Sequence, residues 1–464
     1  MKHEKLSNAL NEVSDAHIAE AATPKKKIRL PWLGAVAAIL VIAILIITTV
    51  HPTTVQAQGL IAAPEYPLMA KFSEFNADAW YQSQETQYDQ PKGYADGTEA
   101  FFRSSIREVL DSDTENQVYS PVNVYMALAM LAETTGGDSR QQLLTLLGSN
   151  SIEDLRTQAG HIWNAHYSDD GLSTSVLANS LWLDEQLSYE EDTVNTLADN
   201  YYASVYRGDL GSSEMNKALQ SWLNEQTHGL LEEQAQGAEM SPYTFLGLAS
   251  TVYYNVQWSD DFSEERNTED IFHTPGGDVR AIFMNRTLYY GPYYWGEDFG
   301  AVALRLRDGS RMWLVLPDEG YTPADILESG HAMDMVFDSP VDYEDQKDIR
   351  VNLSVPKFDI VSDTDLIPEL KNLGVSEIFD STKADFGPLT DDLVLNPYVA
   401  EIGHAVRVSI NEKGVTATAY TVILAEAAAA EIEDEIDFTL NRPFLFVIES
   451  RDGIPLFTGI VNRP

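Results

Sequence analysis

The chain has 464 residues, 44% of them hydrophobic, and no cysteine, which excludes a disulfide framework, thiolate metal sites and a cysteine nucleophile. Its 72 acidic residues outnumber its 30 basic residues and set a formal net charge of −42. So acidic a surface repels nucleic acid and anionic lipid, so neither is an expected partner.

The first strong feature is an uncharged apolar run from Trp32 to Val50, preceded by the basic cluster Lys25-Lys26-Lys27-Ile28-Arg29. About 20 helical residues, each rising roughly 1.5 Å, span a hydrocarbon core about 30 Å thick. Basic residues stay on the cytoplasmic side. The sequence therefore predicts a cytoplasmic segment (residues 1–29) and one transmembrane helix (residues 30–51), with everything after it outside the cell.

A cleaved signal peptide is the alternative, because Val55-Gln56-Ala57 resembles a small-residue cleavage site. Against it, the leading segment is long and carries acids, and the apolar run exceeds a usual signal core. The segment also resembles the juxtamembrane heads of clostridial-type surface proteins, which implies a bacterial source. Up to residue 52 there are 6 basic and 4 acidic residues, against 24 and 68 afterwards, so the net negative charge is predicted to lie entirely outside the cell.

Residues 52–96 are rich in Gln, Tyr, Pro, Ala and Asp, and predict a stalk or an extension packed loosely on the domain that follows, residues 97–464. That domain begins with helical patterns, in the order FFRSSIREVL, SPVNVYMALAMLAETTG and SRQQLLTLLG. Strand-like runs follow, among them LASTVYYNV, AVALRLRD, RMWLVLP, IRVNLSVPKFDI, HAVRVSI, PFLFVIES and PLFTGIV. Helices followed by mostly antiparallel strands predict an α+β fold in one uninterrupted domain.

Short motifs along this domain occur in the order typical of one known family. They are Tyr119-Ser120-Pro121-Val122-Asn123-Val124 before ALAML, Ala178-Asn179-Ser180-Leu181-Trp182, Asn224 to Thr227 with Gly229, Trp258 with Phe262, Leu316-Pro317 before Gly320, Pro356-Lys357-Phe358, Leu373-Gly374, Ala384-Asp385-Phe386, His404 to Thr421, Asn441-Arg442-Pro443-Phe444, and Pro455-Leu456-Phe457-Thr458-Gly459. Together they resemble the serpins, the serine protease inhibitors. The resemblance implies three β-sheets, eight or nine helices and an exposed reactive loop.

The resemblance also implies a mechanism, in which a protease cuts the loop and the loop then inserts as a new strand into the large sheet. The hinge of that loop would comprise Glu412, Gly414, Val415, Thr416, Ala417, Thr418 and Ala419. Side chains alternate between the two faces of a strand, and one face would carry Val415, Ala417, Ala419 and Thr421, which are small or β-branched and uncharged. An ordinary strand of a finished sheet is the alternative interpretation, since Val and Thr favour strands in any case.

The hinge departs mildly from the family pattern, with Val415 where threonine is usual and Lys413 where acids are common. The family's spacing from the hinge glycine puts the scissile bond at Ala428–Ala429, whereas counting back from Pro443 puts it near Ile432–Glu433. Alanine before the cut suits a protease with a small, shallow pocket, which is elastase-like or subtilisin-like. The acidic run that follows would repel enzymes with acidic clefts, or is a solvated spacer.

The resemblance further implies a polar cluster that controls opening of the sheet, with Ser120, Asn179 and His404 at the matching positions and Trp258 where the loop first enters. Buried polar groups need partners, so a mutually satisfied cluster is expected there. Plain core roles for His404 and Trp258 are the alternative.

No enzyme signature is present. His161 and His166 lie five residues apart, which does not place two metal ligands on one helical face, and phosphate-binding, dinucleotide and nucleophile-elbow motifs are missing. We expect no catalysis, no metal and no cofactor, and a monomer whose partner is a target serine protease held covalently. The alternative function is a non-inhibitory surface binding module with the same fold.

Overall fold

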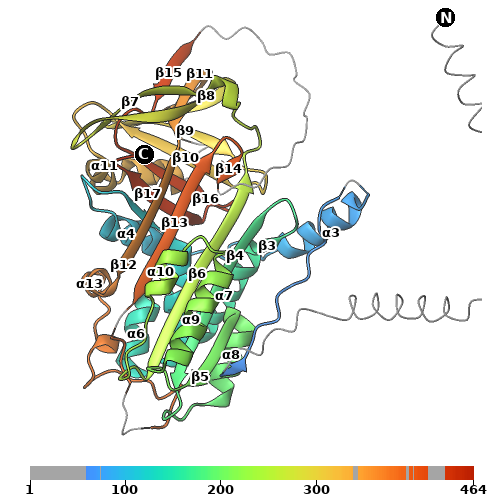
Figure 1. The fold of residues 1–464 in the computed structure, drawn as a ribbon, viewed down its shortest axis with the longest axis vertical. Coiled ribbons are helices and arrows are strands. Elements are labelled where there is room, and N and C mark those ends of the chain that lie inside the picture. The colour runs from blue at the N-terminus through green and yellow to red at the C-terminus, as the bar shows by residue number, and fades with distance from the viewer. Residues whose placement is uncertain (1–58, 74, 338–342, 393–396, 401, 416–433) are drawn as a thin grey trace, which may run out of the picture. The chain divides into compact units, whose positions relative to one another are not determined.

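Two large β-sheets with helices packed against them form the domain in the computed structural model (Figure 1). The structure describes residues 59–73, 75–337, 343–392, 397–400, 402–415 and 434–464. The predicted cytoplasmic segment and transmembrane helix lie outside these residues. Among the described residues, no helix is both long enough and apolar enough to cross a membrane.

Eleven α-helices and two short 3-10 helices occur in the described part of the chain. They are α3 (Ala77–Tyr88), α4 (Glu99–Val109), α5 (Pro121–Thr134), α6 (Gly137–Leu146), α7 (Ile152–His166), α8 (Glu191–Tyr201), α9 (Ser213–Gln226), α10 (Glu232–Gly237), η1 (Glu264–Arg266), α11 (Pro323–Ser329), α12 (His331–Phe337), α13 (Ile367–Asn372) and η2 (Glu377–Phe379).

The strands run mostly antiparallel to their neighbours. They are β1 (Leu60–Ala62), β2 (Gln117–Tyr119), β3 (Ser168–Asp169), β4 (Thr174–Asp184), β5 (Ala203–Gly208), β6 (Leu246–Gln257), β7 (Thr268–Thr274), β8 (Gly277–Trp295), β9 (Phe299–Arg305), β10 (Arg311–Pro317), β11 (Gln346–Pro356), β12 (Phe358–Asp365), β13 (Gly403–Asn411), β14 (Gly414–Val415), β15 (Glu435–Thr439), β16 (Phe444–Glu449) and β17 (Pro455–Val461).

The first sheet has the order β1-β5-β4-β6-β14-β13-β12, and the second has the order β15-β11-β8-β9-β10-β16-β17-β2. The implied three sheets and eight or nine helices are therefore wrong in number for the described residues. The sheets are two because the 19-residue strand β8 pairs with β11 along most of its length and with β9 at its end, from Tyr293 to Trp295. One long strand thus joins what would otherwise be separate sheets.

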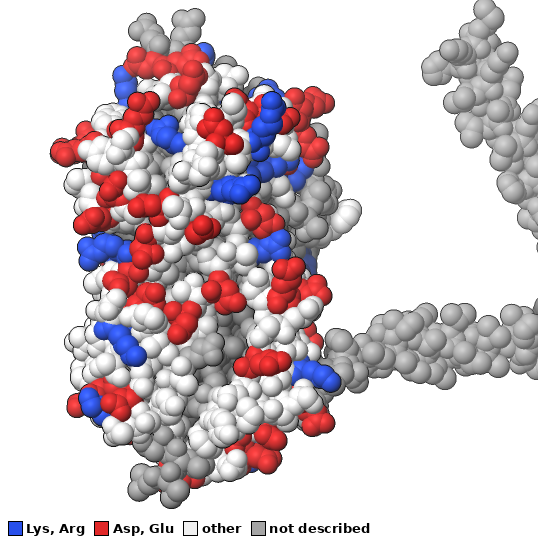
Figure 2. All heavy atoms as spheres, turned by 60° about the vertical axis from the view of Figure 1, so that its left-hand side comes forward, with Lys and Arg blue, Asp and Glu red and all other residues white. Residues whose placement is uncertain are grey.

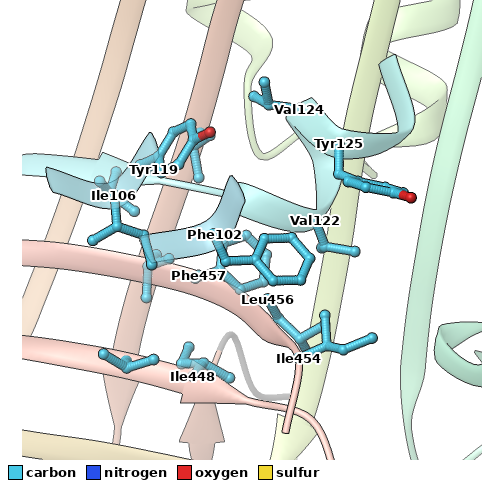
Figure 3. Packing of buried hydrophobic residues seen from close by; sticks show 14 of the residues in the cluster. Phe102, Ile106, Tyr119, Val122, Val124, Tyr125, Ile448, Ile454, Leu456 and Phe457 are labelled. Carbon is cyan, nitrogen blue, oxygen red and sulfur yellow. The ribbon is translucent and has the colours of Figure 1, made fainter. Parts of the chain in front are cut away.

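Helix α5 lies at the centre of the core. Ser120 precedes it with extended backbone and Pro121 occupies its first turn, where proline's fixed φ and missing N–H suit a helix start. It is apolar on all sides, so it is buried on all sides. Figure 3 shows Tyr125 of α5 near Phe102 of α4, above Leu456 of β17. The start of α5 contacts both sheets, because Ser120 hydrogen-bonds to His404 of β13 and to Leu456 of β17.

Residues 59–96 fall in the part expected to be a stalk or a loosely packed extension. They contribute β1, which pairs with the edge strand β5, and α3, which packs against α7. Between these elements the ring of Tyr66 lies 5.3 Å from that of Trp163 and 5.6 Å from that of Tyr167. Residues 57–464 form one compact unit.

The acidic side chains are dispersed over the surface. On the face shown in Figure 2 they are interspersed with neutral residues and with fewer basic ones. This distribution is typical of a surface that keeps a protein soluble.

Candidate functional site

The first sheet contains an opening between two of its central strands. The two-residue strand β14 pairs with both, so that Val415 lies between Ile410 of β13 and Val256 of β6. Beyond β14, no pairing in the described residues joins β6 directly to β13. The two strands stand one strand apart at β14 and come within 8 Å of each other, Cα to Cα, elsewhere along their length. We call the unpaired boundary between Leu246–Tyr254 and Gly403–Ser409 the slot.

A pocket lies behind the lower part of the slot, between it and α5. Its lining is mostly apolar and comes from α5, from both slot strands, from Ile402 just before β13 and from Leu366 just before α13. The lining residues are Asn123, Val124, Ala127, Leu128, Leu131, Leu248, Ser250, Leu366, Ile402, Gly403 and His404. Side chains of a strand added in the slot would have room on this inner face.

Trp258 holds the predicted hinge at the top of the slot. Its indole N–H donates to the carbonyl of Asn411 at 2.8 Å, and its backbone N–H donates to the carbonyl of Lys413 at 2.9 Å. A Cβ on Gly414 would lie 2.3 Å from the carbonyl oxygen of Val256, so only glycine fits there. The indole is fully buried, as expected for a core aromatic, and it also contacts the hinge directly.

Two ion pairs fix the residues just before β14. The buried carboxylate of Glu412 meets Lys357 at 2.5 Å and accepts a hydrogen bond from Asn267, and Lys413 pairs with Asp261 at 3.2 Å. Burial opposes ionisation of Glu412, but the hydrogen bonds from Lys357 and Asn267 outweigh burial and lower its pKa. The hinge is therefore held by the ion pairs of Glu412 and Lys413 and by the hydrogen bonds of Trp258.

His404 and Ser120 meet on the β13 side of the slot. The backbone N–H of Ser120 donates to Nε2 of His404 at 3.1 Å, and the Ser120 hydroxyl donates to the carbonyl of Leu456 at 2.7 Å. Burial lowers the pKa of His404 to about 3, so the imidazole is neutral. The neutral Nε2 of His404 accepts the hydrogen bond from Ser120, and this bond ties the start of α5 to β13.

Asn179 belongs to a separate network on the β6 side. The hydroxyl of Ser250 donates to Oδ1 of Asn179 at 2.7 Å and also contacts Oδ1 of Asn123, whose amide donates back to the Ser250 carbonyl. In the described residues no hydrogen bond links Asn179 to Ser120 or His404. The single cluster expected from the sequence is instead two networks, one on each side of the slot, because Ser120 and Asn123 of the same α5 turn each contact a different slot strand.

Sequence reasoning missed Asn123 and Ser250. Asn123 stands inside the motif that was singled out, and it lies one helical turn beyond Ser120. That spacing alone could have marked it as facing the same region. Ser250 carries no such local signal, since only the pairing of β6 with β4, which sets Ser250 against Asn179, brings it to the network.

Both ends of the segment 416–433 are anchored, in different sheets. Strand β14 ends at Val415 in the first sheet, and β15 pairs with β11 in the second. Arg350 of β11 pairs with Glu435 at 3.5 Å, and the Asn352 amide donates to Glu435 and Asp437. Part of the acidic run is thus bound to basic and amide groups.

The predicted hinge residues Thr416, Ala417, Thr418 and Ala419 lie outside the described residues. So do both candidate scissile bonds, Ala428–Ala429 and Ile432–Glu433.

Comparison with known proteins matches residues 97–464 to the family model of the serpins, described as serine protease inhibitors. Serpin-ZX of Arabidopsis thaliana is 28% identical over 372 residues, covering 76% of this chain and 93% of the relative. Plasminogen activator inhibitor 1 of Sus scrofa is 27% identical over 380 residues, covering 77% and 90%. A serpin-like protein of the archaeon Methanosarcina acetivorans is equally similar, at 27% over 380 residues.

Among solved structures, the thermophilic serpin tengpin in its native state aligns with a TM-score of 0.71 at 22% identity, covering 88% of this chain and all of tengpin. This likeness concerns the fold alone. The family model spans well over half of the chain and includes both slot strands and both anchors of the loop. The chain therefore belongs to the serpin family, whose members are in general serine protease inhibitors.

Proposed function

We propose that this protein inhibits serine proteases as a suicide substrate, by cleavage of the segment 416–433 and insertion of its first part into the slot. The observation that carries the proposal is the slot itself. Strands β6 and β13 are held one strand apart by β14. A strand added there would satisfy backbone donors and acceptors on both edges, which makes the inserted form more stable than the starting form.

The register of β14 supports the proposal. Each residue further along the loop would meet one residue further back on each flanking strand. Ala417 would then lie between Val408 and Tyr254, which are 1% and 3% exposed. Ala419 would follow between Val406 and Val252. At Ala417 the loop thus carries a small side chain where both flanking side chains are deeply buried.

Lower in the slot the same register would place Thr421 between His404 and Ser250. Both of these residues line the pocket in front of α5. Since His404 and Ser250 belong to the two polar networks, a threonine hydroxyl arriving there would have polar partners on either side. The two polar networks would thus lie on either side of Thr421 in the inserted loop.

The chemistry of trapping is an interrupted hydrolysis. The protease serine would attack the carbonyl carbon of Ala428, the bond to Ala429 would break, and the new amine would take a proton from the protease's histidine. This leaves an ester between Ala428 and the protease. Insertion would carry the esterified protease along and distort its active site before water can cleave the ester.

The length of the slot bears on the cleavage site. Residues up to Ala425 would find a partner on β6, because Leu246 is its first residue. A cut after Ala428 leaves three residues between the sheet and the ester, whereas a cut after Ile432 leaves seven. A short tether presses the protease against the end of the sheet, so this length favours Ala428–Ala429. Alanine at that position suits an elastase-like or subtilisin-like protease.

We further propose that residues 30–51 anchor the protein in the cell membrane of a bacterium, with the inhibitory domain outside. The support is the apolar run and the basic cluster before it. A protease inhibitor held there would meet extracellular proteases. Protease protection in intact cells tests it, since an external domain would be digested while residues 1–29 survive.

The test of inhibition mixes residues 57–464 with an elastase-like serine protease and follows the mixture on denaturing gels. A band at the summed mass that survives boiling in detergent would establish covalent trapping, and the mass of the released peptide would identify the scissile bond. Complete cleavage without that band, across several serine proteases, would refute the proposal. The protein would then be a plain substrate or a surface binding module.

A further inference from the structure

The segment that precedes the family domain, residues 59–96 and here called the extension, exposes an unusual amount of apolar surface. Twelve large hydrophobic side chains are exposed in the described part of the chain, and four of them lie in the extension, at Ile61, Leu68, Phe75 and Tyr81. Leu68 and Phe75, at 100% and 99%, have the two largest exposures of the twelve. Single exposed hydrophobic residues are ordinary, but such a concentration in one short segment is typical of a surface that meets a partner.

Aromatic rings gather around α3 of the extension. The ring of Phe72 meets that of Trp80 edge-on, with centroids 5.3 Å apart, and the ring of Trp80 meets that of Tyr81 at 4.8 Å. The indole N–H of Trp80 donates to the carboxylate of Asp170 at 3.1 Å, which ties these rings to the domain. We call the following residues the apolar patch: Leu68, Phe72, Phe75, Trp80 and Tyr81.

Phe75 is presented by an ordered turn. The backbone N–H and the hydroxyl of Ser73 both donate to Oδ1 of Asn76 at 2.8 Å, and the Asn76 amide donates to the carbonyl of Lys71 at 2.8 Å. The backbone N–H of Asn76 also donates to the Ser73 carbonyl at 3.1 Å. The phenyl ring could not fold back onto the domain without breaking these bonds, so its exposure is a property of the turn.

The place of the patch in the chain favours a lipid surface as its occupant. In the anchored protein proposed above, only residues 52–59 separate the apolar run from β1. A fully extended chain of this length spans at most about 30 Å, so the extension would begin close to the bilayer. Tryptophan and tyrosine are enriched where a protein meets the boundary between water and hydrocarbon, because their rings combine apolar and polar groups.

The position of the extension on the domain is compatible with the proposed inhibition. In Figure 1 the extension follows one side of the domain, from β1 to α3. Strand β1 is the last strand at its end of the first sheet, and β5 and β4 lie between it and the slot strand β6. Contact through the extension would therefore not require contact through the slot.

The charge of the extension indicates which lipid it fits. Lys71 is the one basic residue between Leu60 and Tyr88, and its ammonium group is paired with Asp169. Four acidic residues stand in the same stretch: Glu65, Glu74, Asp78 and Glu85. Anionic lipid repels such a segment. The headgroup that fits it is therefore zwitterionic.

We propose that the apolar patch docks on the surface of the membrane that residues 30–51 anchor, with its rings among zwitterionic headgroups. The proposal rests on the membrane anchor proposed above and goes beyond it. A span followed by a short tether leaves the domain free to rotate above the membrane. Docking by the patch would instead hold the inhibitory domain in one orientation.

The experiment reconstitutes the full chain in phosphatidylcholine vesicles and measures contact between α3 and lipid. Because the chain has no cysteine, Gln82→Cys at an exposed position of α3 takes a single fluorophore, which doxyl-labelled lipid quenches on contact. The same label at Glu239→Cys, exposed outside the extension, is the control for mere proximity. The patch variant combines Leu68→Ser with Phe75→Ser. Its matched control is Tyr243→Ser, which removes an aromatic side chain that is 87% exposed outside the extension.

We expect lipid to quench the label at Gln82→Cys and not the label at Glu239→Cys. The patch variant should lower the ratio of docked to free domains on the order of tenfold, because it removes two large apolar side chains from contact with lipid. Tyr243→Ser should leave this ratio unchanged. Addition of phosphatidylglycerol should weaken the quenching, because the extension carries more acidic than basic residues.

An unquenched label at Gln82→Cys, in vesicles that carry the protein, would overturn the docking, and so would equal quenching in the patch variant. Dimerisation of residues 57–464 that the patch variant abolishes would also overturn it, by assigning the patch to a second copy of the chain. A full chain that does not float with the vesicles would refute the anchor and the docking together. Absence of the covalent band with a serine protease would refute inhibition alone, since quenching measures docking independently.

Discussion

Replacing Ala417 with arginine is the sharpest test of strand insertion. The register of β14 would point this side chain inward, between the buried residues Val408 and Tyr254. A charge left there without a partner costs several kcal/mol, and if about 3 kcal/mol is felt in the slowest step, insertion slows on the order of 100-fold. Cleavage precedes insertion, so the loop should be cut at the normal rate while the protease escapes.

The assay counts how many inhibitor molecules are consumed for each protease molecule inactivated, alongside the covalent band on denaturing gels. Thr416→Arg is the matched control, with the same charge one residue away. Its side chain would face outward beside Asn255 and Ser409, which are only half-buried. We expect this control to trap as the wild type does, whereas Ala417→Arg should be consumed as a substrate.

Efficient trapping by Ala417→Arg would refute the register or the insertion mechanism itself. If both variants fail to trap the protease, the argument from burial of the charge is refuted. Arginine near the hinge would then disturb docking of the protease rather than insertion of the strand.

Three further predictions concern the walls of the slot. Burial lowers the pKa of His404 from 6.5 to about 3, so between these two pH values the unfolded chain binds a proton that the folded protein does not. In that window the free energy of unfolding should fall with decreasing pH by about 1.4 kcal/mol per pH unit. Urea unfolding at two pH values should show this slope largely removed in His404→Gln, and an equal slope in both proteins would contradict it. Glu412→Gln should lower the melting temperature at neutral pH. Because the pKa of Glu412 lies below its usual 4.5, the difference in melting temperature between variant and wild type should shrink as pH falls below 4.5. A difference that stays constant with pH would show that the loss comes from the changed shape of the side chain and not from its charge. Trp258→Phe removes the donor to the Asn411 carbonyl and should destabilise the protein by about 1–3 kcal/mol in urea unfolding, whereas an unchanged midpoint would show that water replaces the indole.

Local patterns in the sequence predicted the elements well. The run SPVNVYMALAMLAETTG was expected to be a helix and forms α5, and RMWLVLP and HAVRVSI were expected to be strands and form β10 and β13. Such predictions succeed because alternation and helical periodicity record which face of an element is buried. The order of short motifs also indicated the serpin family, which the family model confirms.

Long-range pairing could not be predicted in this way. No local signal says that β8 continues from one group of strands into the next, and the sheet count was wrong for that reason. The predicted polar cluster joined Ser120 to Asn179, whereas the structure places these two residues in different hydrogen-bond networks. Which partner a buried polar group finds depends on strand register, and register is decided by contacts between residues far apart in the chain.

The sequence by itself determined the class of fold, the acidic exterior, the family and the small inward side chains that a mobile strand needs. Each of these depends on composition or on neighbours within a few residues. The tertiary structure alone decided that no strand pairing joins β6 to β13 below β14 among the described residues, and that β1 extends the sheet. These features arise because packing brings together segments separated by well over a hundred residues, and no periodicity in one segment carries information about the other.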